Sequence, residues 1–114
     1  MKKMLAVLSI AFATSMTATP VKAADVGQTV CEYVAADDKA RLRSYLKSNK
    51  LKIRNIFDGL ACNGSNLLAF ADSQNAVNTG SLIIAKLPKK VVSANLAAIT
   101  SAELSAAANK RVNG

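Results

Sequence analysis

The chain has 114 residues, of which 51% are hydrophobic, and its 15 Lys and Arg outnumber 7 Asp and Glu to give a net charge of +8. It contains no histidine and only two cysteines, which excludes histidine-based catalysis and leaves too few ligands for a zinc site. The excess of positive charge predicts that any electrostatic partner is anionic.

The N-terminus is typical of an export signal. Two lysines precede an almost uninterrupted apolar or small stretch, residues 4–16, and Val21-Lys22-Ala23 places small residues where a signal peptidase cuts. The apolar stretch is shorter than the roughly 20 residues that span a bilayer. We therefore expect cleavage near Ala23, which removes residues 1–23 and leaves residues 24–114 as one small domain without a transmembrane segment, in the periplasm or secreted.

A disulfide is the default for two cysteines in a small exported chain. A bond between Cys31 and Cys62 would close a loop of about 30 residues and disfavour the unfolded chain by roughly 3–4 kcal/mol in the chain-entropy treatment. A redox-active pair is the weaker interpretation, because the two are far apart in sequence and form no C-x-x-C motif. We expect a structural crosslink, with no bound metal and no cofactor.

Two helices are predicted after the leader. Asp25 precedes apolar residues at helical spacing up to Val34, which indicates a short first helix. Asp37 can cap a second helix, in which Leu42, Tyr45 and Leu46 form the buried stripe and basic residues line the opposite side.

The pattern then changes between Lys50 and Phe57, where basic and apolar residues alternate. This period of two predicts an extended finger rather than a helix. Asp58-Gly59 and Asn63-Gly64 indicate turns around Cys62.

Further helices are predicted beyond these turns. Ser65 is the expected cap of a third helix, and Thr79 is expected to open a fourth, which Pro88 ends because proline cannot continue a helix. In the alanine-rich tail, residues 89–114, Thr100-Ser101-Ala102-Glu103 reads as a capping box for a last helix.

These elements predict a mainly α fold, a small disulfide-stapled domain of about five short helices. The order resembles ankyrin-like helical hairpins joined by an extended finger. The resemblance is carried by Asn63-Gly64-Ser65-Asn66-Leu67-Leu68-Ala69-Phe70-Ala71, which looks like the turn and first helix of a repeat. Asn66 and Ala69 depart from that pattern, where a repeat has proline and histidine.

The whole chain also resembles an uncharacterised family of small exported bacterial proteins, a domain of unknown function with two cysteines. The resemblance is carried by a central block from Arg41-Leu42-Arg43 through Ala71. It implies a compartment and a fold, and it implies no activity.

An enzyme would have to use carboxylates, and the candidates are Asp37, Asp38, Asp58 and Asp72. All four are explained as helix caps and turn residues. We therefore expect no catalytic residues and no enzymatic activity.

A basic strip is the candidate for anion binding, and its members are Lys39, Arg41, Arg43, Lys47, Lys50, Lys52 and Arg54. Partners would be anionic envelope polymers or a lipid surface. Nucleic acid is disfavoured because no aromatic residues interleave with the cations for base stacking. The competing interpretation is a solvated helix face.

Ile56, Phe57 and Leu60 are the candidates for contact with an envelope protein if they are exposed, whereas burial beneath the finger would make them core residues. The sequence favours a protein-interaction module with an unknown envelope partner. The alternative is an electrostatic binder of anionic polymers or lipid headgroups.

Overall fold

The structure is a computed structural model and describes residues 23–114. Over that range the chain forms seven α-helices, one 3-10 helix and no strand beyond an isolated bridge between Cys62 and Ser65. The helices are α1 (Ala23–Ala35), α2 (Lys39–Ser48), α3 (Ile53–Ile56), α4 (Leu67–Ser73), α5 (Val77–Lys86), α6 (Lys89–Asn95), η2 (Leu96–Ala98) and α7 (Ala102–Asn113).

The mainly α fold is thus confirmed, with seven α-helices within residues 23–114 in place of about five. The expected leader lies outside the described residues apart from Ala23. None of the helices within residues 23–114 has the length and apolar character needed to cross a membrane.

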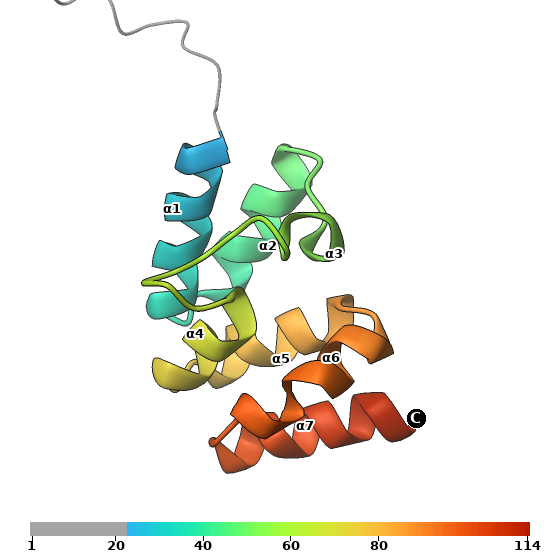
Figure 1. The fold of residues 1–114 in the computed structure, drawn as a ribbon. Coiled ribbons are helices and arrows are strands. Elements are labelled where there is room, and N and C mark those ends of the chain that lie inside the picture. The colour runs from blue at the N-terminus through green and yellow to red at the C-terminus, as the bar shows by residue number, and fades with distance from the viewer. Residues whose placement is uncertain (1–22) are drawn as a thin grey trace, which may run out of the picture.

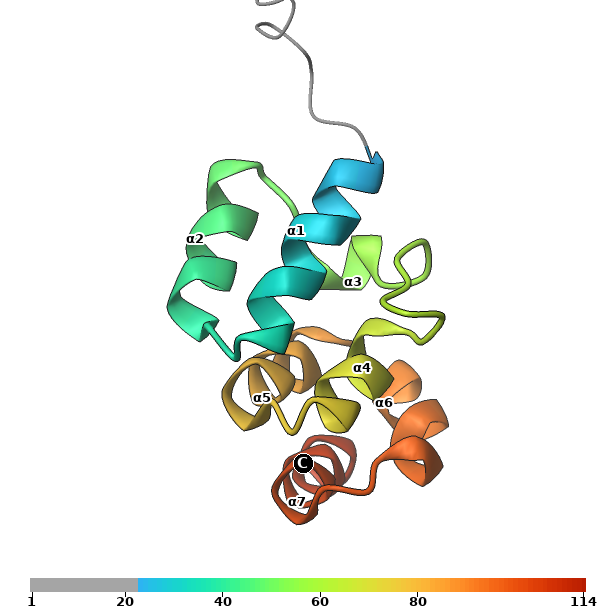
Figure 2. The same cartoon turned by 90° about the vertical axis from the view of Figure 1, so that its left-hand side faces the viewer.

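Helix α5 lies at the centre of the fold (Figure 1). It contacts α1, α2, α3, α4 and α7. The hairpin of α1 and α2 lies on one side of α5 and α7 on the other, and α7 also packs against α6 (Figure 2). Ile83 and Ile84 of α5 are at most 2% exposed and pack in one core with Leu67, Leu68 and Leu104.

Three helices end on a left-handed residue that is not glycine. Asp37 follows α1, Lys50 follows α2 and Asn75 follows α4, each with φ of 54°. In each case the next residue donates its N–H back into the helix, as Leu51 does to the carbonyl oxygen of Leu46 at 2.8 Å. These Schellman stops reverse the chain after short helices and so allow them to pack as hairpins.

The side chain of Asp37 caps α5 and not α2, which corrects the sequence prediction. Its Oδ1 accepts hydrogen bonds from the backbone N–H of Thr79 at 2.7 Å and from the Thr79 hydroxyl at 3.1 Å. Its Oδ2 accepts from the N–H and the side-chain amide of Asn78. Asp38 caps α2 instead, by accepting from the N–H of Arg41. Asp37 therefore ties the N-terminal hairpin to α5.

The extended finger predicted from Lys50 to Phe57 is wrong, because this segment contains the short helix α3. Lys52 is extended and starts the helix, and Ile53 and Phe57 follow at a helical spacing of four residues. Both side chains are buried, at 2% and 6% exposure. Burial of this i, i+4 pair outweighs the short alternation of charges that suggested a strand.

The predicted starts of four other helices are corrected by a few residues. Helix α1 begins at Ala23, before the expected capping Asp25, and α5 begins at Val77, before Thr79, which is fully buried inside the helix. Asn66, not Ser65, caps α4 by accepting from the N–H of Ala69 at 2.8 Å. Ser101, one residue after the predicted Thr100, caps α7.

The C-terminal tail forms more structure than its composition indicated. Pro88 follows the end of α5, as predicted, but it also occupies the N-cap position of α6. Leu104 and Ala108 of α7 are fully buried. Gly80 allows α5 and α7 to approach each other closely, because a Cβ built at this position would lie 2.6 Å from Cδ2 of Leu104. The first part of α7 therefore packs on the first part of α5, and Arg111 near the end of α7 donates to the carbonyl oxygen of Leu87, just after the end of α5.

Candidate anion-binding groove

The structure exposes all seven residues of the predicted basic strip but gathers only four of them. Arg43 and Lys47 on α2, and Lys52 and Arg54 at α3, line one groove. Lys39, Arg41 and Lys50 are not among the lining residues. Arg41 instead forms an ion pair with Asp38, with Nε 3.5 Å from Oδ2.

Two further cations complete the groove, and sequence reasoning missed both. Lys86 belongs to the last turn of α5 and Arg111 to the last turn of α7. Both line the same hollow of about 690 Å³ as the cations of α2 and α3. Lys86 reaches the groove because α5 packs against α2 and α3, and Arg111 because α7 packs against α5, so no local pattern in the sequence could have assigned them.

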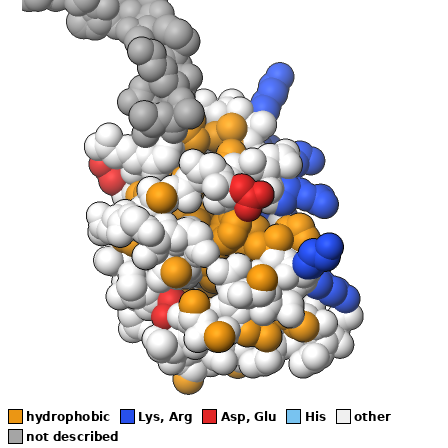
Figure 3. Space-filling view, in the orientation of Figure 1, with side chains coloured by type: hydrophobic (Ala, Val, Ile, Leu, Met, Phe, Trp, Pro, Cys, Tyr) orange, Lys and Arg blue, Asp and Glu red, His pale blue; other side chains and the backbone are white. Residues whose placement is uncertain are grey.

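The groove has a single sign of charge. Its six ionisable lining residues are all Lys or Arg, and no carboxylate is among the residues that line it. Figure 3 shows Lys and Arg side chains gathered along one edge of the face that it draws. A concave surface lined by one sign of charge focuses the field and attracts ions of the opposite sign.

Part of this charge complements helix ends. Lys47, Lys86 and Arg111 lie in the last turns of three helices, where the helix dipole is negative. Each helix end carries about half a unit of negative charge, or about 1.5 units for three. Most of the positive charge of the six side chains is therefore left to act on a ligand.

Arg111 is held in place by the backbone. Its Nε and Nη2 donate to the carbonyl oxygen of Leu87 at 3.3 and 3.0 Å, and the residue is half-buried. Arginine carries five N–H donors, so these two bonds orient the guanidinium and leave others for a ligand. The floor of the groove contains buried Leu46, Ile53 and Leu82.

A second hollow, of about 740 Å³, lies beside the disulfide between α1, α3 and the loop around Cys62. Ile56 is half-buried and lines it, as does Leu60. Phe57 and Leu60 are only 6% and 7% exposed and pack in the core. The exposure that a partner-binding role requires is therefore absent for Phe57 and Leu60, and of the three candidates only Ile56 offers accessible surface.

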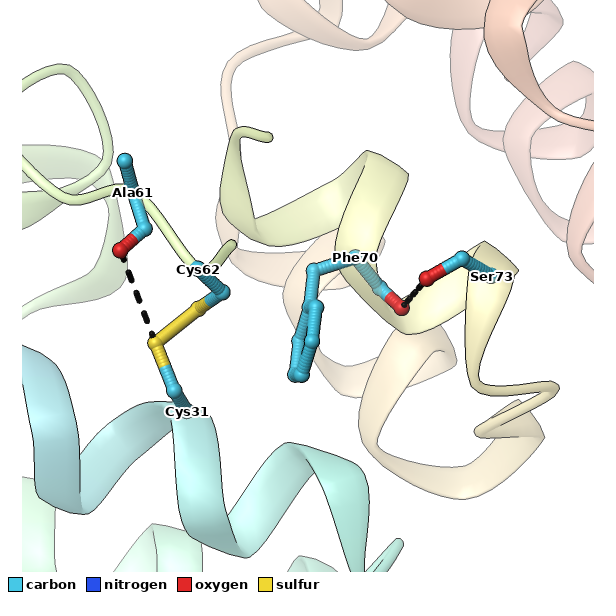
Figure 4. Close-up of a disulfide and its surroundings, with 5 residues drawn as sticks. All are labelled: Cys31, Ala61, Cys62, Phe70 and Ser73. Atoms are coloured by element: carbon cyan, nitrogen blue, oxygen red, sulfur yellow. Dashed lines mark hydrogen bonds between the residues drawn. A yellow bond between two sulfur atoms is a disulfide. The ribbon is translucent and has the colours of Figure 1, made fainter. Parts of the chain in front are cut away.

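The predicted disulfide joins Cys31 of α1 to Cys62, with Cα atoms 5.7 Å apart. Figure 4 shows the ring of Phe70 next to the bond, and Sγ of Cys31 lies 3.8 Å from the carbonyl oxygen of Ala61. Cys62 is 3% exposed. The bond therefore fastens the loop after α3 to α1, and it is compatible with an oxidising, extracytoplasmic location.

Three of the four carboxylates that could have served catalysis bind backbone N–H groups. Asp37 and Asp38 cap α5 and α2, and Asp72 accepts from the N–H groups of Thr100 and Ser101 and from the Thr100 hydroxyl. Partial burial raises the pKa of Asp72, but these hydrogen bonds outweigh it and hold the pKa below its usual value. Asp58 is exposed. Among the described residues no group of three or more His, Cys, Asp or Glu could hold a metal ion.

Comparison with known proteins identifies the family of the chain. A protein-family model described as a protein of unknown function (DUF3718) matches residues 30–94, which is more than half of the chain. The chain therefore belongs to this family. No curated protein and no solved structure matches it. The ankyrin-like resemblance stays a prediction, and residues 62–65 form a turn before α4.

Proposed function

We propose that this member of the DUF3718 family is an exported, non-catalytic protein that binds anionic polymers or lipid headgroups of the cell envelope through the basic groove. The observation that carries the proposal is the set of six cations, from α2, α3, α5 and α7, that line one hollow without a carboxylate. Three of the predicted strip residues lie outside this hollow, so the groove is a more specific candidate than the strip.

Export is supported by the leader-like residues 1–23 and by the disulfide, which persists in oxidising compartments. The test is the intact mass of the protein recovered from the periplasm, with alkylation before and after reduction. Loss of residues 1–23 and two thiols that label only after reduction are expected. A retained leader or freely labelled thiols would contradict this part of the proposal.

Binding is tested with the disulfide-bonded protein and two probes, vesicles that contain phosphatidylglycerol and long-chain inorganic polyphosphate. We expect affinity for at least one probe to fall steeply as salt rises from about 50 to about 200 mM, because anion binding releases counterions. Reversal of charge at Arg43 and Lys47 should lower affinity by about tenfold or more, since each cation contributes on the order of 1 kcal/mol.

The matched control reverses Lys39 and Lys90, which are exposed but do not line the groove. It changes the net charge by the same amount as the test variant. Equal losses for the two variants would mean that only net charge matters, and absent or salt-independent binding would reject the proposal.

A protein-interaction module is the second candidate, and the accessible surface of Ile56 in the hollow beside the disulfide favours it. A photo-crosslinking residue placed at Ile56 should capture one envelope protein, whereas the same residue at exposed Asp58 should not. Capture at both positions or at neither would count against a docking site in this hollow.

A further inference from the structure

We infer that the groove takes an extended, flexible polyanion without aromatic bases, and that Lys86 and Arg111 are specificity-determining residues for it; this inference rests on the proposed anion-binding function. Four properties of the groove lead to this choice: its two walls, the number of its charges, the chemistry of its lining and the fixed position of Arg111.

The six cations come from separate walls of a concave surface. One wall is formed by α2, which carries Arg43 and Lys47, and by α3 with its N-cap, which supply Arg54 and Lys52. The other is formed by the ends of α5 and α7, which carry Lys86 and Arg111. A narrow, flexible chain can enter such a hollow and meet cations of both walls. The flat surface of a bilayer contacts side chains that protrude from the protein. It should therefore bind exposed Lys39 or Lys50 as readily as the cations inside the groove.

The number of charges favours a ligand with several anionic groups. Six cations in one hollow repel one another, and a single phosphate or carboxylate relieves only part of that repulsion. A polyanion places successive charges opposite successive cations and releases its own condensed counterions. Affinity should therefore grow with the number of linked charges.

The lining argues against nucleic acid and against acyl chains. No aromatic residue lines the groove, and the two tyrosines pack against each other, with ring centroids 5.9 Å apart. Bases would thus find no stacking platform. The floor residues Leu46 and Leu82 are each 8% exposed and Ile53 is 2% exposed, so the accessible apolar lining comes mainly from Leu51, Ala85 and Pro88, which is a small surface for an acyl chain.

Arg111 is oriented before any ligand arrives. Its two hydrogen bonds to the Leu87 carbonyl oxygen orient the guanidinium within the lining of the groove. Lys86 precedes that carbonyl by one residue and is exposed. These two cations come from α5 and α7, apart from the predicted basic strip, and would decide whether a ligand contacts cations beyond those of α2 and α3.

The test titrates the disulfide-bonded protein with long-chain inorganic polyphosphate, orthophosphate, phosphatidylglycerol vesicles and single-stranded DNA at equal total phosphate. Polyphosphate should bind more tightly than the other three. Lys86→Gln should weaken polyphosphate binding by about fivefold and lower the slope of log affinity against log salt by about 0.7–1. Lys90→Gln, four residues away and outside the groove, should change neither.

Arg111→Lys is the second variant. It keeps the charge but loses the planar donor geometry, so it separates orientation of the guanidinium from charge. We expect weaker polyphosphate binding with an unchanged salt slope, measured well below the unfolding midpoint of the variant. Equal effects of Lys86→Gln and Lys90→Gln, or vesicles that bind as tightly as polyphosphate, would overturn the inference while leaving electrostatic binding intact. Orthophosphate that competes as well as polyphosphate would also overturn it. No binding to any probe would reject the proposed function itself.

Discussion

Replacement of Asp37 by asparagine tests the contact that joins the N-terminal hairpin to α5. The carboxylate accepts four hydrogen bonds from Asn78 and Thr79, two of them from backbone N–H groups at the start of α5. Asparagine keeps the size of the side chain and tolerates the left-handed backbone, at φ of 54°, so the substitution isolates the acceptor and its charge.

The expected cost follows from these bonds. An asparagine oxygen can still accept the bonds from Thr79, but its amide group faces the Asn78 donors and cannot accept from them. Loss of a charge-assisted backbone bond, together with the favourable charge at the helix N-terminus, costs about 1–2 kcal/mol. For a domain of this size the midpoint temperature should fall by roughly 5–15 °C.

The assay is thermal and urea unfolding followed by circular dichroism at neutral pH, with Asp58→Asn as the matched control. Asp58 is exposed and should change stability by less than about 0.5 kcal/mol. If Asp37→Asn costs no more than Asp58→Asn, the carboxylate does not stabilise α5 and the reasoning is refuted.

Three further perturbations test other parts of the fold. Cys62→Ser should lower the unfolding midpoint by as much as reductant lowers it in the unchanged protein, and an unchanged midpoint would mean that the disulfide adds no stability. Lys50→Gly should raise the free energy of unfolding by about 1 kcal/mol, because glycine adopts the left-handed conformation without strain. Asn75→Gly should raise it less, because asparagine already tolerates this conformation. Equal gains for the two variants would contradict the strain argument. The pKa of Asp72 is lower in the folded than in the unfolded chain, so its contribution to the free energy of unfolding is fully present above its ordinary pKa of 3.8 and is lost as pH falls through the lowered pKa. Between about pH 5 and about pH 2 the free energy of unfolding should therefore fall less for Asp72→Asn than for the unchanged protein. Equal falls for the two proteins would contradict a stabilising role of the Asp72 carboxylate.

The sequence predicted those features that depend on local chemistry. The disulfide follows from cysteine count and the expected compartment, and the end of α5 before Pro88 follows from the missing N–H of proline. Buried Leu42 and Leu46 of α2 were identified by helical spacing. Each of these signals lies within a few residues of the feature that it predicts, or requires no knowledge of the fold.

Features that depend on distant contacts were missed or misread. Asp37 has the composition of a local cap, but its partners lie 41 and 42 residues away. The candidate site likewise combines residues that are distant in sequence. Four of its cations are close in sequence, whereas Lys86 joins them because α5 packs against α2 and α3, and Arg111 joins them because α7 packs on α5, where Gly80 leaves space.

The most direct test of the central claim is a titration of ¹⁵N-labelled, disulfide-bonded protein with long-chain inorganic polyphosphate, followed by amide chemical shifts. The account predicts that the largest salt-sensitive changes cluster at Lys47, Lys52, Lys86 and Arg111, with small changes at Lys39 and Lys90. Changes of equal size at all exposed cations, or changes confined to residues outside the groove, would contradict it.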